Sequence, residues 1–265
     1  MGDFPLLVAT DLDGTIIRGD GTISARTVAA FARVEAAGAR FVLVTGRPPR
    51  WMREIAAIFG HRGTAICANG ALAYDMRTDA VTARHLIPAP VLAAAAAALR
   101  AAVPGIGIAV EYPDGGAADG LYQAVNWDIN QAIPRPGDAV LFSRPASKLL
   151  ARHLGYNCDD LLALTQPAIG GLVSVTHSNG KGLIEASALG VSKASVVAEI
   201  AADFGIAREA VLAFGDMPND LPLLTWASTS CAVANAHPDV LAAATHVIGG
   251  VDEDGVAEYL ERVYP

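Results

Sequence analysis

Asp11 and Asp13 are two carboxylates separated by one residue, and they follow the apolar run at residues 6–9 after a single threonine, Thr10. A short apolar run closed by a polar turn is typical of a buried parallel strand. Because side chains two residues apart on an extended chain point the same way, we predict that both carboxylates emerge together at the strand's end. Gly14 would let the chain turn sharply, and the Thr15 hydroxyl would tie the turn down. Carboxylates leaving a buried strand need a cation or a shared proton, so this stretch predicts a metal or acid–base site.

A calcium loop and an ordinary acidic turn also contain the pattern D-x-D-G. An EF-hand loop that began at Asp11 would have glycine at its sixth position and glutamate at its twelfth. These positions hold Ile16 and Thr22, so the sequence excludes an EF-hand. An acidic turn remains the alternative to a catalytic site, and the other motifs of the chain decide between them.

Polar residues also follow three further apolar runs, each with the length of a short buried strand. They are Thr45, Gly46 and Arg47 after residues 41–44, Asn69 after residues 65–67, and Asp216, Asn219 and Asp220 after residues 210–214. Stretches with the periodicity of amphipathic helices separate these runs. Strands that alternate with helices form a parallel sheet, which binds ligands at the carboxyl ends of its strands. We therefore expect these polar residues near Asp11.

Lys193 stands at an unfavourable position for a cation. Residues 196–204 have the apolar spacing of a helix, and Ser192 can cap its first turn. Lys193 then lies in that first turn, where the helix dipole disfavours positive charge. This placement indicates that Lys193 faces an anion.

The extended and helical patterns divide the chain into two domains. Strands and helices alternate in residues 1–82 and again in residues 187–265. Residues 83–186 instead combine five extended runs, at 85–87, 106–112, 121–127, 140–142 and 172–176, with helices at 89–103 and 159–164. We predict an α/β fold in which a doubly wound, Rossmann-like parallel sheet carries an inserted α/β domain.

The composition of the 265 residues, 52% hydrophobic and 17% charged, indicates a compact globular protein. A net charge of −8 argues against a surface for nucleic acid or an anionic membrane. Cys67, Cys158 and Cys231 form no C-x-x-C pair and are expected to be reduced thiols. The first residues lack a basic leader, and the alanine-rich stretch is too short to span a bilayer. We expect a cytoplasmic protein without nucleic-acid or membrane partners.

Seven motifs resemble, in order and context, those of the Cof-type (IIB) branch of the haloacid dehalogenase (HAD) superfamily of phosphatases. They are D-L-D-G-T at 11–15, T-G-R at 45–47, N-G-A at 69–71, G-V-S-K at 190–193, G-D-x-x-N-D at 215–220, N-A at 235–236 and D-G-V at 254–256. The resemblance spans both ends of the chain. It implies a HAD core domain at 1–82 and 187–265, with a C2B-type cap domain at 83–186.

The resemblance also implies a role for each polar residue. Asp11 would be the nucleophile that forms an aspartyl-phosphate, and Asp13 the acid for the leaving oxygen and then the base for water. Mg²⁺ would be bound by Asp11, by the backbone carbonyl of Asp13 and by Asp216. The other expected residues are Thr45 and Lys193 on the phosphoryl group, Gly46, Arg47, Asn69 and Asn219 in substrate binding, and Asn219 with Asp220 in orienting Lys193 and the metal shell.

The expected function is that of a Mg²⁺-dependent phosphatase of small phosphorylated metabolites, with sugar phosphates as the favoured class. A phosphotransferase such as a hexose phosphomutase is an alternative, because it would use the same site. A phosphometabolite-binding protein without activity is another alternative, although the complete acidic set argues against it. A dehalogenase is disfavoured, because its leaving group would give Asp13 no role. We expect a monomer or a small homo-oligomer.

Overall fold

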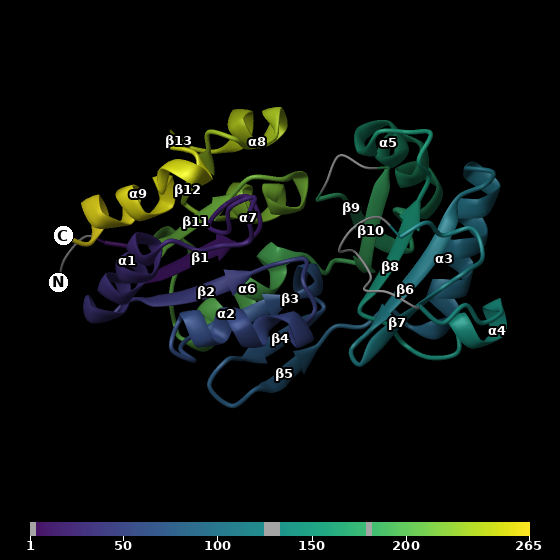
Figure 1. Ribbon diagram of the computed structural model, residues 1–265, viewed down its shortest axis with the longest axis horizontal. Helices are drawn as coiled ribbons and strands as arrows, with labels where there is room; N and C mark the ends of the chain where they lie inside the picture. Colours follow the sequence, from purple (N-terminus) through teal and green to yellow (C-terminus); the bar gives the residue numbers. More distant parts are fainter. Residues whose placement is uncertain (1–3, 125–132, 179–181) are drawn as a thin grey trace. The chain divides into compact units, whose positions relative to one another are not determined.

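The structure is a computed structural model that describes residues 4–124, 133–178 and 182–265. The chain forms two compact units (Figure 1). The first combines Met1–Ala83 with Ser192–Pro265, and the second is Arg84–Val191. The second unit is thus inserted between the two halves of the first.

The first unit is built on an eight-stranded sheet in the order β13-β12-β11-β1-β2-β3-β4-β5. Its strands are β1 (Leu7–Asp11), β2 (Arg40–Val44), β3 (Thr64–Cys67), β4 (Leu72–Asp75), β5 (Ala80–Arg84), β11 (Val211–Gly215), β12 (Thr229–Val233) and β13 (His246–Ile248). Neighbours from β13 to β3 pair in parallel, and β4 runs antiparallel to β3. This confirms the predicted parallel sheet, whereas β4 and β5 had no counterpart among the predicted strands.

β1 lies where the strand order reverses, because β2 and β3 follow it on one side and β11 to β13 lie on the other. Open parallel sheets bind ligands at the carboxyl ends of the strands next to such a point. β1 ends at Asp11, and β11 ends at Gly215, directly before Asp216. The fold therefore brings the two acidic motifs to the same edge of the sheet.

Helices cover both faces of this sheet. They are α1 (Ala25–Ala36), α2 (Met52–Ile58), α6 (Lys193–Asp203), α7 (Leu221–Trp226), α8 (Pro238–Ala243) and α9 (Gly255–Val263). Arg40 and Phe41 are neighbours on β2 and so point to opposite faces. Phe41 packs against Phe31 of α1, with ring centroids 5.3 Å apart, whereas the Arg40 guanidinium lies 3.6 Å from the ring centroid of Phe204, the C-cap residue of α6. α1 and α9 pack together, and so do α6 and α7.

Ser24 and Ser192 cap α1 and α6, as the sequence predicts. The Ser24 side chain accepts the N–H of Thr27, and the Ser192 side chain accepts the N–H of Ser195. The Ser195 hydroxyl accepts the N–H of Ser192 in return, which completes a capping box. α6 therefore begins at Lys193 and holds that residue in its first turn.

The second unit contains a five-stranded antiparallel sheet in the order β7-β6-β8-β10-β9. Its elements are α3 (Ala89–Ala102), β6 (Gly107–Tyr112), β7 (Gly115–Ala118), α4 (Asp138–Leu141), β8 (Lys148–Arg152), α5 (Cys158–Ile169), β9 (Val173–Thr176) and β10 (Leu183–Ala188). α3 and α5 share one apolar core with Ile108, Leu149 and Ile184 of the sheet. Lys148 and Glu185, which alternate with these residues, lie on the opposite face of the sheet. The predicted α/β insertion is confirmed.

The sequence predicts an extended run at 140–142, and this prediction is wrong. Val140 and Leu141 end the short helix α4, whose N-cap Gly137 has an extended backbone. Asp138 in the first turn interacts favourably with the helix dipole. Leu141 is buried and Val140 is exposed, so consecutive apolar residues here do not share a buried face.

Two other runs that were predicted to be extended do not form strands in the residues that the structure describes. Residues 85–87 are not a strand and contribute one isolated bridge between Ile87 and Ala146. In the run at 121–127, residues 121–124 are not extended into a strand, and residues 125–127 lie outside the described residues.

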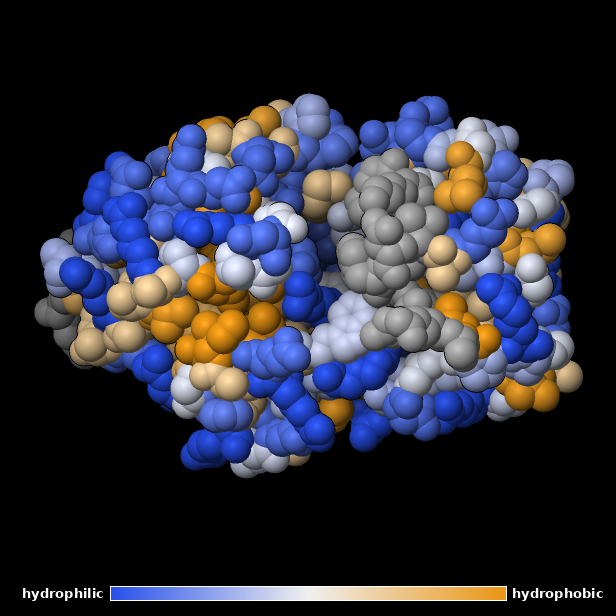
Figure 2. Space-filling view, viewed as in Figure 1, coloured by the Kyte–Doolittle hydropathy of each residue, from blue (hydrophilic) through white to orange (hydrophobic). Residues whose placement is uncertain are grey.

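No helix among the described residues combines the length and the hydropathy that crossing a bilayer requires. The alanine-rich helix α3 has 14 residues. Figure 2 shows hydrophilic residues over much of the viewed surface of both units, with apolar patches between them.

Candidate active site

The chain makes a tight turn directly after Asp11, the last residue of β1. The N–H of Ile17 donates to the Leu12 carbonyl at 2.7 Å. Gly14 has a φ of +83°, and a Cβ atom there would lie 2.2 Å from Asp216 Oδ2. Glycine is therefore required both for the turn and for the close approach of Asp216.

Asp13 lies in this turn, because β1 ends at Asp11. The geometry of an extended chain, which would point the two carboxylates the same way, therefore does not apply to Asp13. Its side chain is 43% exposed, whereas that of Asp11 is 8% exposed. Both Asp13 oxygens accept hydrogen bonds from Arg47. The Thr15 hydroxyl, expected to tie the turn down, instead donates to Asp216 Oδ1 at 3.1 Å. The two carboxylates thus share one strand end but differ in burial and in partners.

Lys193 is completely buried between two carboxylates. Its Nζ donates to Asp11 Oδ1 at 2.5 Å and to Asp220 Oδ1 at 2.6 Å. These carboxylates are the anions that its place in the first turn of α6 led us to expect. The ammonium therefore orients Asp11 and links β1 to the loop after β11.

Burial and the charges of neighbouring groups together shift the pKa values of Asp11, Asp216 and Lys193. Desolvation raises the pKa of Asp11 to about 7, although the Lys193 ammonium opposes this shift. Desolvation, with the charge of Asp11, also raises the pKa of Asp216 well above its ordinary value. Burial alone would lower the pKa of Lys193, but the charges of Asp11 and Asp220 outweigh burial and raise it. The acids repel one another, and a bound cation would relieve that repulsion.

Asp220 and Asn219 differ in what they contact. Asp220 Oδ2 accepts the N–H groups of Asp216 and Met217, both at 3.1 Å, while its other oxygen holds Lys193. Asp220 therefore orients Lys193. Asn219 was also expected to orient Lys193. In the structure, its Nδ2 donates to Asn69 Oδ1 at 3.1 Å, and this hydrogen bond joins the loops after β11 and β3.

The acidic residues fit a hard divalent cation. Oxygens of Asp11, Asp216 and Asp220 lie within 4.8 Å of one another. Both Asp220 oxygens are committed to Lys193 and the backbone, whereas the described contacts of Asp11 and Asp216 occupy one oxygen of each. Carboxylate oxygens are the ligands that Mg²⁺ prefers. The side chain of Asp13 is not in this group, so of Asp13 only the backbone carbonyl remains as a candidate ligand.

Thr45, Gly46 and Arg47 follow β2 in one loop, and Asn69 lies in the loop after β3. The N–H of Asn69 donates to the Thr45 carbonyl at 3.0 Å, and Thr45 Oγ1 accepts the N–H of Arg47 at 3.0 Å. Ala68 and Asn69 have φ values of +52° and +58°, a left-handed conformation that is uncommon outside glycine. Backbone strain of this kind persists only where surrounding contacts fix it, as is common at functional sites.

Asn235 supports the turn after β1, a role that its position in the sequence does not predict. Its Nδ2 donates to the Gly14 carbonyl at 2.8 Å, and its Oδ1 accepts the N–H of Val251 at 2.9 Å. In the sequence, Asn235 is marked only by the N-A motif at 235–236, and that motif does not indicate which residue Asn235 contacts.

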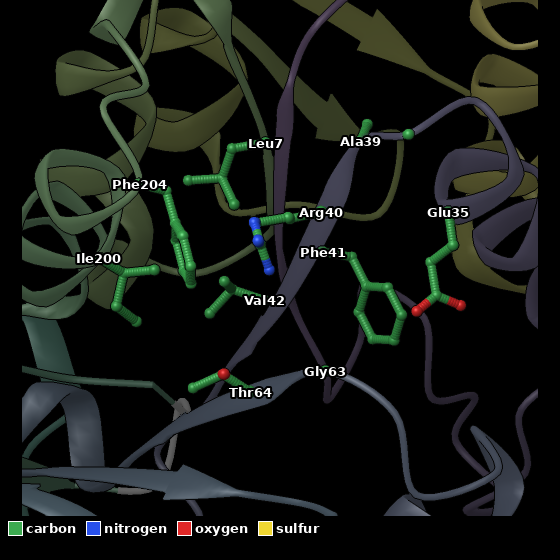
Figure 3. Close-up of a pocket in the computed structure, with 11 residues that line it drawn as sticks. Leu7, Glu35, Ala39, Arg40, Phe41, Val42, Gly63, Thr64, Ile200 and Phe204 are labelled. Carbon is green, nitrogen blue, oxygen red and sulfur yellow. The ribbon is translucent and has the colours of Figure 1, made fainter.

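A cavity of about 370 Å³ lies at the other end of the same strands (Figure 3). Leu7, Arg40 and Thr64, which line it, belong to the amino-terminal ends of β1, β2 and β3. Its two charged side chains already have partners, since Arg40 stacks on Phe204 and Glu35 pairs with Arg62. It contains none of the predicted site residues.

Comparison with known proteins establishes the family. Residues 8–260 match the family model for haloacid dehalogenase-like hydrolases. The chain is 25% identical to a 5-amino-6-(5-phospho-D-ribitylamino)uracil phosphatase of Bacillus subtilis over 98% of each chain. It is 28% identical to a pyridoxal phosphate phosphatase of Escherichia coli over 96% of this chain and 97% of that one. Its fold resembles that of a HAD subclass IIB sugar phosphatase, with a TM-score of 0.79 and 22% identity over 97% of this chain and 98% of that one. The expected resemblance is confirmed, and the chain belongs to the haloacid dehalogenase-like hydrolase family, within its Cof-type phosphatase branch.

Proposed function

We propose that this enzyme is a Mg²⁺-dependent phosphatase that hydrolyses small phosphorylated metabolites through an aspartyl-phosphate on Asp11. The observation that carries this proposal is the 2.5 Å contact between Asp11 and the buried Lys193, inside a cluster of carboxylates. The ammonium holds Asp11 in one orientation and leaves its second oxygen for attack. This position is the switch point of the sheet, where a ligand is expected.

In the proposed reaction, an Asp11 oxygen forms a bond to phosphorus while the bond from phosphorus to the leaving oxygen breaks. Asp13 gives a proton to the leaving oxygen. It then takes a proton from the water that attacks the aspartyl-phosphate, which regenerates the Asp11 carboxylate and releases inorganic phosphate. Lys193 and the Thr45 hydroxyl stabilise negative charge on the phosphoryl oxygens.

Asp11, Asp216 and the backbone carbonyl of Asp13 would hold Mg²⁺. When bound, Mg²⁺ supplies positive charge that offsets the charges of the carboxylates and of the phosphoryl group. The cluster of carboxylate oxygens within 4.8 Å supports this assignment.

Sugar phosphates are the proposed substrate class. The structural neighbour described above is named as a sugar phosphatase, and the two relatives described above are named for pyridoxal phosphate and for 5-amino-6-(5-phospho-D-ribitylamino)uracil. A test panel should therefore contain sugar phosphates together with these two compounds.

Chelation should remove the activity. With Mg²⁺, the protein should release inorganic phosphate from members of this panel, and excess EDTA should reduce release to background. The buried charges of Asp11 and Asp216 would then face the phosphate without a metal ion, and the single ammonium of Lys193 would not offset them. Mg²⁺ added beyond the EDTA should restore turnover. Full turnover in EDTA after dialysis would refute the metal assignment, and no turnover of any ester would refute the phosphatase proposal.

The second unit should select the leaving group. Its sheet carries the buried ion pair of Lys148 and Glu185, 2.7 Å apart, on the face opposite α3 and α5, and such groups can bind polar substrate atoms. Replacing residues 83–186 with the corresponding segment of a family member of different specificity should change the ranking of kcat/KM across the panel by about 10-fold or more. The Mg²⁺ requirement should stay. An unchanged ranking would place specificity in the first unit.

A further inference from the structure

Arg47 makes a bidentate ion pair with Asp13. Its Nε donates to Oδ2 at 2.8 Å and its Nη2 donates to Oδ1 at 2.5 Å, so one guanidinium holds both oxygens of the carboxylate. Such a pair fixes the direction in which the carboxylate points, which a single contact from an ammonium does not.

The backbone on both sides of this pair is held in place. Asp13 pairs with Ile17 in a bridge within the tight turn. The N–H of Arg47 donates to Thr45 Oγ1 at 3.0 Å, and its carbonyl accepts the N–H of Ala68 at 2.9 Å. The part of Asp13 that remains free to rotate is therefore its side chain, and Arg47 reaches that side chain from a fixed loop.

We propose that Arg47 is a positioning residue for the proton transfers of Asp13. Asp13 is 43% exposed, so without Arg47 its carboxyl group would move among several rotamers in contact with water. Asp11 is in a different situation, because Lys193 and burial already hold it. The inference rests on the proposed function, and it assigns Arg47 to Asp13 instead of to the expected contact with substrate.

The pair is compatible with both proton transfers. When Asp13 carries a proton on one oxygen, its other oxygen still accepts a hydrogen bond from Arg47. The proton then passes to the leaving oxygen as the bond from that oxygen to phosphorus breaks. In the second step the Asp13 carboxylate takes a proton from water as water attacks phosphorus. Arg47 stays protonated throughout and aims the carboxyl group.

Arg47→Lys tests this role, because lysine keeps the positive charge but lacks the planar fork. With a sugar phosphate, single-turnover release of the leaving group should fall by about 10- to 100-fold, part of the roughly 10²- to 10⁴-fold that acid–base catalysis contributes. With p-nitrophenyl phosphate it should fall by less than about 3-fold, since that leaving group departs without a proton. In the Asp13→Asn background the same substitution should change neither rate.

Arg26→Lys is the matched control. Arg26 holds Glu261 with the same two nitrogens, Nε at 3.1 Å and Nη2 at 2.7 Å, and this pair joins α1 to α9, neither of which contains a residue of the carboxylate cluster. Its substitution should leave both rates unchanged, which separates a specific effect at Arg47 from the general loss of a bidentate pair.

Equal losses with both substrates would overturn the role of Arg47, because it would then act on the phosphoryl group that the substrates share. A further loss in the Asp13→Asn background, or unchanged rates in Arg47→Lys, would also overturn it. Failure of the proposed function has a different signature, since the unmodified protein would then hydrolyse no ester of the panel. If Asp13→Asn shows a substrate-dependent loss and Arg47→Lys does not, only the role of Arg47 fails.

Discussion

Replacing Asp11 with asparagine should abolish hydrolysis of every phosphate ester, whatever its leaving group. The amide has no charged oxygen to attack phosphorus, so the covalent intermediate does not form. Removal of a nucleophile from a serine protease lowers kcat by a factor on the order of 10⁶, and we expect a loss of comparable scale. Steady-state phosphate release measures the loss of hydrolysis, and acid-quenched labelling with a radioactive phosphate ester measures the loss of the covalent intermediate.

The Asp11→Asn protein should still fold, because Lys193 keeps its 2.6 Å contact with Asp220. Asp254→Asn is the matched control. Asp254 pairs with Arg18 at 2.8 Å and has a φ of +56°, a conformation that asparagine also tolerates. That variant should retain activity. Labelled phosphoprotein in Asp11→Asn, or a loss smaller than about 10-fold, would contradict the role of Asp11 as nucleophile.

The arrangement of the core carboxylates and Lys193 could be anticipated from sequence, because regular geometry determines it. Parallel strands end at one edge of a sheet, and the Ser192 cap sets the position of Lys193. Side-chain pairs between loops could not be anticipated. Asn219 contacts Asn69, 150 residues away, instead of Lys193, and this choice depends on loop conformations that no periodicity specifies.

The second unit was harder to predict because some of its strands contain buried charges. Lys148 and Arg152 in β8 and Glu185 in β10 are all at most 5% exposed. A charged residue normally indicates an exposed position, because burying an unpaired charge is costly. Lys148 and Glu185 offset that cost for each other at 2.7 Å, but only once the strands are paired. In the sequence alone, each of these strands therefore looks like an apolar run that a charged residue interrupts, and it is not recognised as a buried strand.

Asp13→Asn should separate the acid from the nucleophile. A sugar alkoxide is a poor leaving group whose developing charge must be met by a proton, whereas p-nitrophenolate leaves without one. Single-turnover release of the leaving group should therefore fall by roughly 10²- to 10⁴-fold with a sugar phosphate and far less with p-nitrophenyl phosphate. Asp11→Asn, in contrast, should fail with both.

Multiple turnover of Asp13→Asn should stall with both substrates, because Asp13 also activates the water that hydrolyses the aspartyl-phosphate. The two substrates therefore have to be compared in the first turnover, where only protonation of the leaving oxygen distinguishes them. Labelled phosphoprotein should accumulate from p-nitrophenyl phosphate, which would show that attack by Asp11 continues without the acid. Equal first-turnover losses with the two substrates would mean that Asp13 acts mainly through its backbone carbonyl and the integrity of the turn, and its assignment as acid and base would be wrong.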